Sequence, residues 1–332
     1  MARAATNAVR VCMGVQAGEK VVIVTDEARE HIGHALAAEC EQAEAPVRVL
    51  RIEDYIKRPA ESLPDRFIHD IDDFEPDVSF YAAQSLEGEL QKFRGPYMNH
   101  ILYDRAKPLR HGHMVDIDDR CMEEGMTADY EAIARLTFKV NEIVKDARLI
   151  EVQAPSGTDM RATLDPSRLR WHPCPGIYHR PGEWGNLPEG ETFTSPASLE
   201  GYLGAEVIGD YFSNRYGVLD TPMKLEVAGG RVRKVIHPDE ELQGDMERYL
   251  REYPNGDRAG EFAIGTNVAV KHLIGNMLQD EKIPGVHVAF GHPYPEETGA
   301  DWDAPSHCDF VTTRSTIKVD GQYLMKDGEF VL

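Results

Sequence analysis

A short segment of the sequence, SHCDF, places a histidine and an aspartate two residues apart, at His307 and Asp309. Alternate residues of a β-strand point to the same face, so the imidazole and the carboxylate would project side by side while Cys308 points away. Both groups are ligands for divalent metal ions. An isolated pair of this kind is most often a surface feature, so the segment predicts a metal site only if further donors lie nearby.

Further donors occur in two segments upstream. In HVAFGHPYPEETGA, His287 opens an alternating stretch in which Val288 and Phe290 face the opposite way, so the imidazole lies on a polar or metal-facing side. Glu281 precedes this stretch in DEKIPGV, and Glu261 begins EFAIGTN. A lone glutamate is usually solvated. The occurrence of these carboxylates with the histidines is what favours a metal centre.

In order and spacing these residues resemble the aminopeptidase T family of thermophilic, two-metal exopeptidases. NLPEGETFTSP is similar to the family's segment around its first metal-binding glutamate, and EFAIGTN to the segment that carries the second. DEKIPGVHVAFG is similar to the family pattern D-E-x-x-x-x-H-x-A-x-G, with one extra residue in this chain, and SHCDF matches the closing H-x-D-F. SGTDMRATL and IKVDGQYLMKDGEFVL are also similar, so the resemblance covers nearly the whole C-terminal half.

The resemblance implies a set of metal ligands and two catalytic residues. The implied metal ligands are Glu191, Glu261, Glu281, His287, His307 and Asp309. Glu261 would bridge the metals or activate water, and Tyr294 stands at the offset of the family's catalytic-site tyrosine. The family also implies two divalent ions (Zn, Co or Mn) and a homodimer.

The function expected from this resemblance is aminopeptidase-type hydrolysis of small peptides or amides. Two divalent ions would lower the pKa of a bridging water toward ~7 and hold the scissile carbonyl. Glu261 would take the proton of the water and return it to the leaving amine. Tyr294 would hydrogen-bond the oxyanion. An acidic site also suits a substrate with a free α-ammonium group.

A second reaction class stays open, because the chain also resembles the 2,5-dihydroxypyridine 5,6-dioxygenase group, shortened relatives that use one non-haem Fe(II). Such a site needs two histidines and one carboxylate, which His287, His307 and Asp309 could supply. The segment WHPCPGIYHRPGEW would suit a flat ring substrate; the role of residues 171–185 is otherwise open. The full carboxylate set favours hydrolysis. A third hypothesis is a binding protein that kept the fold without activity, and metal content would decide.

The first half of the sequence predicts an α/β domain over residues 1–155. The stretches VVIVT, VRVLRI, VSFYAA and LIEVQA predict buried strands of an open, largely parallel sheet, with helices over residues 26–43 and 128–147. The turn TDEARE lacks G-x-G-x-x-G, so dinucleotide binding is not predicted. We interpret His111 and His113 as solvated loop histidines.

The second half predicts an α+β metal-binding catalytic domain over residues 156–332. MKLEVAGGRVRKVI predicts an antiparallel hairpin that turns at Gly229-Gly230. STIKVDGQYLMKDGEFVL predicts a small meander that turns at Asp320-Gly321 and Asp327-Gly328. Between these hairpins, GTNVAVKHLIGNMLQDEK predicts one helix.

Composition limits the partners and the compartment. The chain has 332 residues and a formal charge of −21, which argues against nucleic acid and favours a divalent cation. No apolar stretch approaches the ~18 residues that span a bilayer, so we expect no membrane partner. The five cysteines lie far apart without a C-x-x-C pair, and the N-terminal segment lacks an apolar export signal. We expect a cytoplasmic protein that binds a short peptide or another small molecule.

Overall fold

The computed structural model describes all 332 residues, which form two compact units. Unit 1 comprises residues 1–131 and 176–189, and unit 2 comprises residues 132–175 and 190–332. This division differs from the boundary expected at residue 155, since the chain leaves unit 1 inside a helix and later returns to it for fourteen residues.

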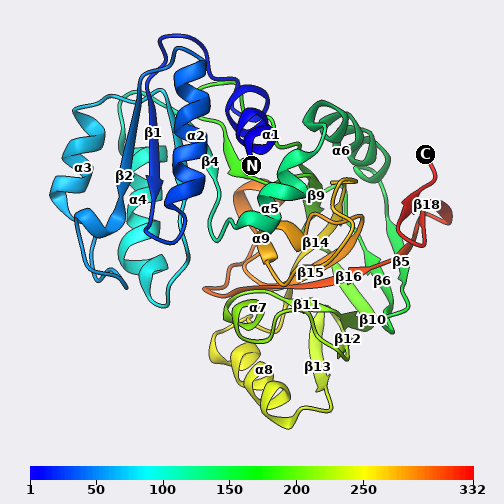
Figure 1. The fold of residues 1–332 in the computed structure, drawn as a ribbon. Coiled ribbons are helices and arrows are strands. Elements are labelled where there is room, and N and C mark those ends of the chain that lie inside the picture. Colours follow the sequence, from blue (N-terminus) through cyan, green and yellow to red (C-terminus); the bar gives the residue numbers. More distant parts are fainter. The chain divides into compact units, whose positions relative to one another are not determined.

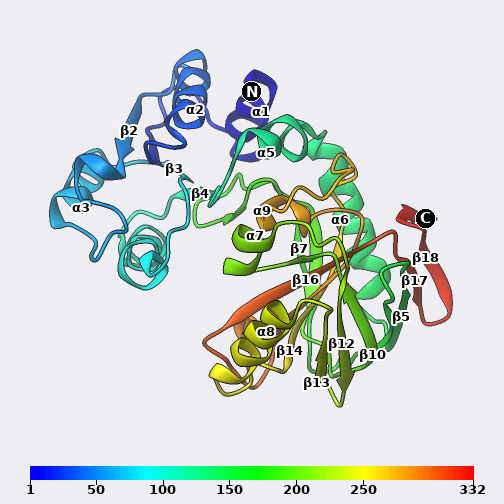
Figure 2. The same cartoon turned by 60° about the horizontal axis from the view of Figure 1, so that its bottom comes forward.

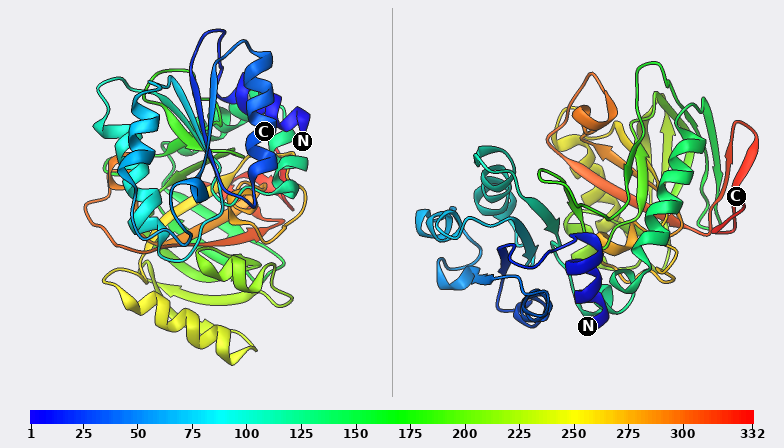
Figure 3. Two further views of the ribbon diagram at one scale, coloured as in Figure 1. Left: turned by 60° about the vertical axis from the view of Figure 1, so that its left-hand side comes forward. Right: turned by 90° about the horizontal axis from the view of Figure 1, so that it is seen from above.

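Unit 1 is built on a parallel sheet, sheet A, with the strand order β2-β1-β3-β4-β8. Its strands are β1 (Val21–Thr25), β2 (Val47–Arg51), β3 (Val78–Ala82), β4 (Arg110–His113) and β8 (Trp184–Asn186). Helices lie on both faces of the sheet (Figure 3, left), which is why β1 and β3 are mostly apolar and are buried along their whole length. The open parallel sheet expected from the sequence is confirmed.

The helices of unit 1 are short and include single π-helical and 3₁₀ turns. They are α1 (Ala2–Thr6), η1 (Asn7–Cys12), α2 (Glu30–Gln42), η2 (Ile52–Asp54), α3 (Asp65–Asp72), η3 (Leu90–Arg94), α4 (Gly95–Asn99), η4 (His100–Asp104), α5 (Asp119–Glu123) and η5 (Gly125–Thr127). The prediction that His111 and His113 are solvated loop histidines is wrong. Both lie in β4 and are buried, because β4 is an interior strand of sheet A.

Unit 2 contains two antiparallel sheets. Sheet B has the order β13-β12-β10-β6-β5-β17-β18-β19, and sheet C has the order β11-β16-β15-β14-β9-β7. Their strands are β5 (Leu149–Gln153), β6 (Asp159–Thr163), β7 (His172–Cys174), β9 (Glu191–Thr194), β10 (Ser198–Ala205), β11 (Val207–Ile208), β12 (Met223–Ala228), β13 (Arg231–Ile236), β14 (Ala259–Gly265), β15 (Gly285–Gly291), β16 (His307–Thr313), β17 (Thr316–Val319), β18 (Gln322–Lys326) and β19 (Glu329–Phe330).

One apolar core joins the two sheets of unit 2 with its helices. Leu203 and Leu225 of sheet B belong to the same buried cluster as Phe262, Val288 and Phe310 of sheet C. The helices of this unit are α6 (Tyr130–Val144), which starts in unit 1, α7 (Tyr211–Tyr216), α8 (Glu240–Glu252), α9 (Met277–Asp280) and α10 (Pro295–Thr298). The expected helix over residues 128–147 is therefore confirmed.

The strand at residues 149–153 belongs to sheet B and not to the parallel sheet in which we expected it. β5 pairs antiparallel with β6 on one side and with β17 on the other, and the C-terminal hairpin lies beside it (Figures 1 and 2). Alternation along a strand shows which face is buried but does not show which strand lies next to it.

The predicted hairpins are confirmed. β12 and β13 pair around Gly229-Gly230, and β17, β18 and β19 form a meander. At Asp320-Gly321 and Asp327-Gly328 both turn residues have positive φ, as two-residue turns of this kind require.

The helix expected between the hairpins is mostly absent, since only α9 forms there. The Asp280 carboxylate accepts hydrogen bonds from the backbone N–H groups of Ile274, Gly275 and Asn276, and this fixes the preceding residues as a loop.

A helix that was not expected, α8, packs its buried Leu242 and Met246 beside β13 (Figure 2). No helix of the structure combines the length and the apolarity that crossing a bilayer requires.

Candidate metal centre

The donor side chains gather on one face of sheet C. Glu261 of β14 lies opposite Ala289 of β15, which lies opposite Asp309 of β16. Residues opposed across neighbouring strands share a face, and so do residues two apart along one strand. His287 and His307 therefore project from this same face. We call it the ligand face.

Glu191 is a further carboxylate on a strand of sheet C, and it lies at the edge of this group of donors. Glu191 begins β9 and lies opposite Gly265 of β14, while His307 lies opposite Gly291 of β15. The positions between the donors are thus small: Ala263, Gly265, Ala289 and Gly291. Small residues leave space above the sheet, into which the longer donor side chains converge.

The other face of the same strands is apolar and forms the core of unit 2. Phe262, Val288, Cys308 and Phe310 are fully buried there. Cys308 thus points away from the ligand face, as the alternation of a strand predicts. The sequence folds in this way because each of these strands alternates a donor or a small residue with a large apolar one.

The donor atoms lie close together. His287 Nε2 is 3.1 Å from Glu261 Oε1 and 3.4 Å from Glu191 Oε2. His307 Nε2 is 3.6 Å from Glu261 Oε2 and 3.4 Å from Asp309 Oδ1. Three overlapping triplets have ligand atoms within 4.8 Å of one another: Glu191–Glu261–His287, Glu261–His307–Asp309 and Glu281–His287–Asp309. All six residues implied by the sequence are thus brought together.

A lysine that sequence reasoning missed lies among these donors. The Lys282 ammonium donates to Glu191 Oε1 at 2.8 Å and to Glu281 Oε1 at 2.7 Å, and its side chain is 1% exposed. It directly follows a proposed ligand in the sequence, and nothing in the local pattern shows which way its side chain turns.

Negative charge dominates the electrostatics of the ligand face. Burial lowers the pKa of His287, but its hydrogen bond to Glu261 and the nearby Glu191 carboxylate outweigh burial and raise the pKa to about 9. Burial likewise lowers the pKa of His307, while Asp309 and Glu261 raise it to about 10. Both imidazoles are therefore drawn toward the protonated form by surplus carboxylates.

The pKa values of two carboxyl groups, Glu281 and Asp309, shift in opposite directions. Burial, together with the charges of Asp309 and Glu191, raises the pKa of Glu281 to about 8, although Lys282 acts against this shift. Burial would also raise the pKa of Asp309, but His307 beside it holds the pKa at about 2. One carboxyl group is thus easily protonated and its neighbour stays ionised.

These features fit divalent cations. Glu191 Oε2 is buried and makes no hydrogen bond within the protein. The carboxylates of Glu191, Glu261, Glu281 and Asp309 carry more negative charge than one ammonium group can balance. Buried charge of this size is stable only when it is paired or when it coordinates a metal. Carboxylate and imidazole donors in this mixture suit Zn, Co or Mn.

Tyr294 lies beside the donors in a strained conformation. It precedes α10 with φ 50° and ψ 67°, a left-handed conformation that costs a tyrosine energy and that is often found at functional sites. Its ring lies 5.0 Å from the His307 ring and 5.6 Å from the Phe193 ring, centroid to centroid. Burial, and then the Glu261 carboxylate, raises its pKa far above the usual value, so the hydroxyl remains a hydrogen-bond donor.

His172 is a second residue that sequence reasoning did not place. It belongs to β7, opposite Phe193, and its ring lies 5.4 Å from the phenylalanine ring. Burial lowers its pKa, although Glu297 and Glu191 act in the opposite sense. His172 thus extends the ligand face with a neutral imidazole, within the segment whose role was left open.

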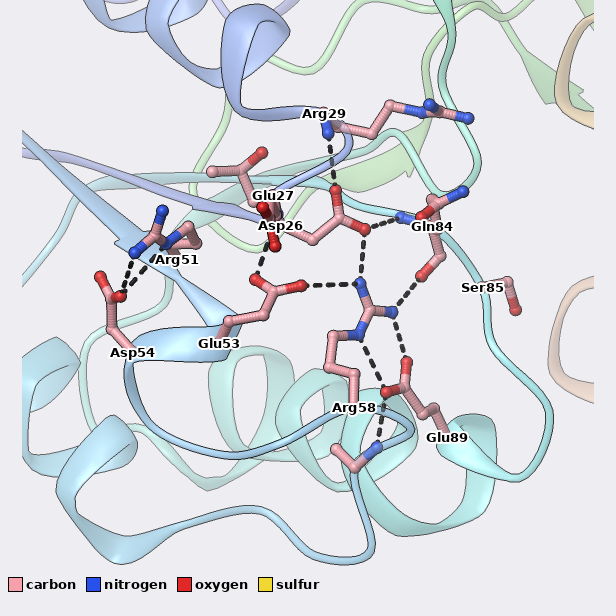
Figure 4. Close-up of polar contacts among 12 residues, drawn as sticks. Asp26, Glu27, Arg29, Arg51, Glu53, Asp54, Arg58, Gln84, Ser85 and Glu89 are labelled. Atoms are coloured by element: carbon pink, nitrogen blue, oxygen red, sulfur yellow. Dashed lines mark hydrogen bonds and ion pairs between the residues drawn. The ribbon is translucent and has the colours of Figure 1, made fainter.

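A separate polar cluster lies in unit 1, at the ends of β1 and β3 (Figure 4). The Arg58 guanidinium pairs with Asp26 and Glu89 and donates to the backbone oxygen of Gln84. Asp26 also accepts the N–H groups of Arg29 and Gln84. The strand order reverses between β1 and β3, which is where α/β sheets often bind ligands. Here buried ion pairs fill that position, so the cluster is structural.

The two-sheet unit has donors that converge on one buried face, as a protein with a metal centre requires. Residues 119–327 match the family described as thermophilic metalloprotease (M29), a match that covers more than half of the chain. The chain belongs to this thermophilic metalloprotease family.

Two solved structures share the fold over almost the whole chain. Wild-type AmpT from Thermus thermophilus is 17% identical, with a TM-score of 0.72 over 100% of this chain and 98% of its own. A 2,5-dihydroxypyridine dioxygenase from Pseudomonas putida is 18% identical, with a TM-score of 0.70 over 99% of this chain and 96% of its own. No curated protein sequence matches the chain significantly.

Proposed function

We propose that this protein is a metal-dependent hydrolase of the aminopeptidase type that acts on small peptides or amides. The observation that carries the proposal is the convergence of six donor side chains on the buried ligand face of sheet C. Membership of the thermophilic metalloprotease family supports the same reaction class. All proposed site residues fall within residues 156–332, which we propose as the catalytic domain.

The proposed metal ligands are the residues that the structure brings together: Glu191, Glu261, Glu281, His287, His307 and Asp309. Bound there, a divalent ion (Zn, Co or Mn) would supply a Lewis acid for the scissile carbonyl and would acidify a bound water. The protein's part is to hold the donors rigidly, and strands do so better than loops.

Glu261 is the proposed general base. Its carboxylate is buried at the centre of the donor group, with one oxygen near His287 and the other near His307. It would accept the proton of the attacking water and then return it to the leaving amine. Both transfers require the same carboxylate to face the water and the scissile nitrogen.

Tyr294 is the proposed oxyanion donor. Its hydroxyl stays protonated because burial and the surrounding carboxylates raise its pKa. The strained backbone and the ring contacts with Phe193 and His307 fix its direction. A donor held in place in this way stabilises the negative charge that develops on the carbonyl oxygen.

The proposed substrates carry a free amino terminus. The ligand face has surplus carboxylate charge, which attracts an α-ammonium group. Phe193 and His172 line the same face and would contact an apolar or aromatic side chain. From the family resemblance we also propose a homodimer in the cytoplasm.

The test compares hydrolysis with oxygen consumption. Anaerobically purified protein is loaded with Zn, Co or Mn and given aminoacyl amides, together with the same amides acetylated at the α-amine. The proposal expects turnover of the free amines and at least tenfold slower turnover of the acetylated ones. Oxygen uptake with a dihydroxypyridine and Fe(II), without amide hydrolysis, would instead establish the dioxygenase alternative held by His287, His307 and Asp309.

A further inference from the structure

Lys282 brings an ammonium group into the donor group. Its ammonium lies between two of the proposed ligands, 2.8 Å from Glu191 Oε1 and 2.7 Å from Glu281 Oε1. The side chain is 1% exposed, so water does not screen these contacts. A lysine buried to this degree requires paired carboxylates, and here it takes one oxygen from each of them.

We propose that Lys282 occupies the position that a second divalent ion would take, so that the ligand face holds one divalent ion per chain, among Glu261, His307 and Asp309. This inference rests on the proposed function, because it concerns the same metal centre. It departs from the two ions that the family resemblance implies.

The geometry separates the donors into two groups. Lys282 pairs with Glu191 and Glu281, whereas the donor atoms of Glu261, His307 and Asp309 form a triplet of their own. His287 borders both groups, since its Nε2 lies near Glu261 and Glu191, and the Glu281–His287–Asp309 triplet marks where the two groups meet. The chain itself thus supplies a cation, the Lys282 ammonium, to Glu191 and Glu281. The triplet of Glu261, His307 and Asp309 is the group that would take a metal ion.

The backbone of Lys282 holds this arrangement in place. Its N–H donates to the carbonyl of Gln279, and its carbonyl accepts the N–H of Asn267. The ammonium could leave only by breaking two buried ion pairs, and a second ion would have to break both of them in order to displace it.

Charge balance points the same way. Four carboxylates, one ammonium and one divalent ion leave the centre with one negative charge when both imidazoles are neutral. A substrate α-ammonium would neutralise that charge. A second divalent ion in place of the ammonium would leave the centre neutral, without the surplus negative charge that attracts the proposed substrate.

The test counts ions in the whole protein. Wild type, Lys282→Met and the surface control Lys145→Met are loaded with Mn(II), desalted and analysed for metal content per chain. Lys145 pairs with Glu142 on the exposed side of unit 2, so the control loses a lysine without touching the ligand face. We expect one ion per chain in wild type and in the control, and two in Lys282→Met.

Electron paramagnetic resonance of the same samples gives a second readout that is independent of activity. Two metal ions in one site lie ~3.5–4 Å apart, close enough for their spins to couple. We expect an uncoupled Mn(II) signal in wild type and a spin-coupled signal in Lys282→Met.

The outcomes separate this inference from the proposed function. Two coupled ions in wild type, or one ion in folded Lys282→Met, would overturn the role of Lys282 and leave the hydrolase proposal standing. Wild type that binds no divalent ion would overturn both. If Lys282→Met does not fold, the wild-type count and signal still decide whether the ligand face holds one ion or two, and two ions would overturn the inference.

Discussion

At the scale of single residues, Glu261 connects the two halves of the donor group. One of its oxygens is 3.1 Å from His287 Nε2 and the other is 3.6 Å from His307 Nε2. A carboxylate in this position can both bind an ion and accept a proton from water. Replacing Glu261 by glutamine, which has the same shape but no charge, tests these two roles while the fold is kept.

We expect Glu261→Gln to lower kcat by about 10²–10⁴-fold, the range usually lost with a general acid–base group. The amide keeps the shape of the side chain, so the circular dichroism spectrum should not change. Glu247→Gln, on the partly exposed surface of α8, is the matched control and should keep wild-type kcat. Full turnover by folded Glu261→Gln would remove this residue from the mechanism.

Tyr294→Phe tests the oxyanion donor. The ring contacts with Phe193 and His307 remain, and only the hydroxyl is lost. We expect kcat to fall by about 10²–10³-fold, with KM and metal content close to wild type, because the donor acts mainly in the transition state. A rise in KM at constant kcat would show instead that the hydroxyl binds the substrate.

The donors themselves could be predicted from the sequence, whereas two of their neighbours could not. The H-x-D spacing and the alternation after His287 are local patterns that a strand turns into a shared face. Lys282 and His172 reach the same face from a loop and from a short strand, through tertiary contacts that have no local pattern.

At the scale of elements, strand β15 determines how closely the donor strands approach one another. Gly291 ends this strand with φ 113°, and a Cβ atom there would lie 2.0 Å from the backbone oxygen of Ser306. Both the conformation and the contact exclude a side chain. This glycine therefore allows His307 to begin β16 next to the end of β15.

We expect Gly291→Ala to lower the free energy of unfolding by roughly 2 kcal/mol or more, because the clash involves backbone that cannot move aside cheaply. Urea unfolding measures the change. Gly244→Ala, in the middle of helix α8, is a control for which we expect the opposite sign. The free energy of unfolding should rise by ~0.5–1 kcal/mol. A Gly291→Ala protein as stable as wild type would show that β15 can shift.

Elements that depend on local turn chemistry were predicted well. The hairpins at Gly229-Gly230 and Asp320-Gly321 form as expected, since their turn residues fix the pairing. The helix expected over residues 265–282 fails because one side chain, Asp280, binds the backbone ahead of it. Such a capping contact competes with helix formation and is not visible as a periodic pattern.

At the scale of the whole molecule, both units bury titratable side chains. Unit 2 buries the carboxylates and His287 of the ligand face, and unit 1 buries, besides the ion pairs of Arg58, the two imidazoles of His111 and His113 in sheet A. The Ser79 hydroxyl lies 2.7 Å from His111 Nδ1, and His111 Nε2 lies 3.2 Å from His113 Nδ1. Burial lowers the pKa of His111 to about 3 and also lowers the pKa of His113.

The stability of unit 1 should therefore fall as the solution becomes more acidic. Below the ordinary pKa of ~6.5 the unfolded chain binds protons at these histidines, and the folded chain does not. The stabilisation is complete above about pH 6.5 and is lost as the pH falls toward the lowered folded values. At pH 5.5 each histidine should cost about 1.4 kcal/mol relative to pH 7.5.

Urea unfolding of unit 1 at these two pH values, followed in wild type and in His111→Gln, measures the effect. The variant should lose about half of the pH dependence. His34→Gln, which removes an exposed histidine of α2, should keep all of it. A His111→Gln protein with the same difference in stability between the two pH values as wild type would contradict the buried, neutral state of the pair.

The placement of β5 has a consequence for fragments of this protein. β5 lies in the interior of sheet B, between β6 and β17. A fragment that starts at residue 156 would keep the proposed ligands but would open two new strand edges in the middle of that sheet. Unpaired edges of this kind recruit strands from other molecules. Such a fragment should aggregate, and a fragment that includes α6 and β5 should stay monodisperse.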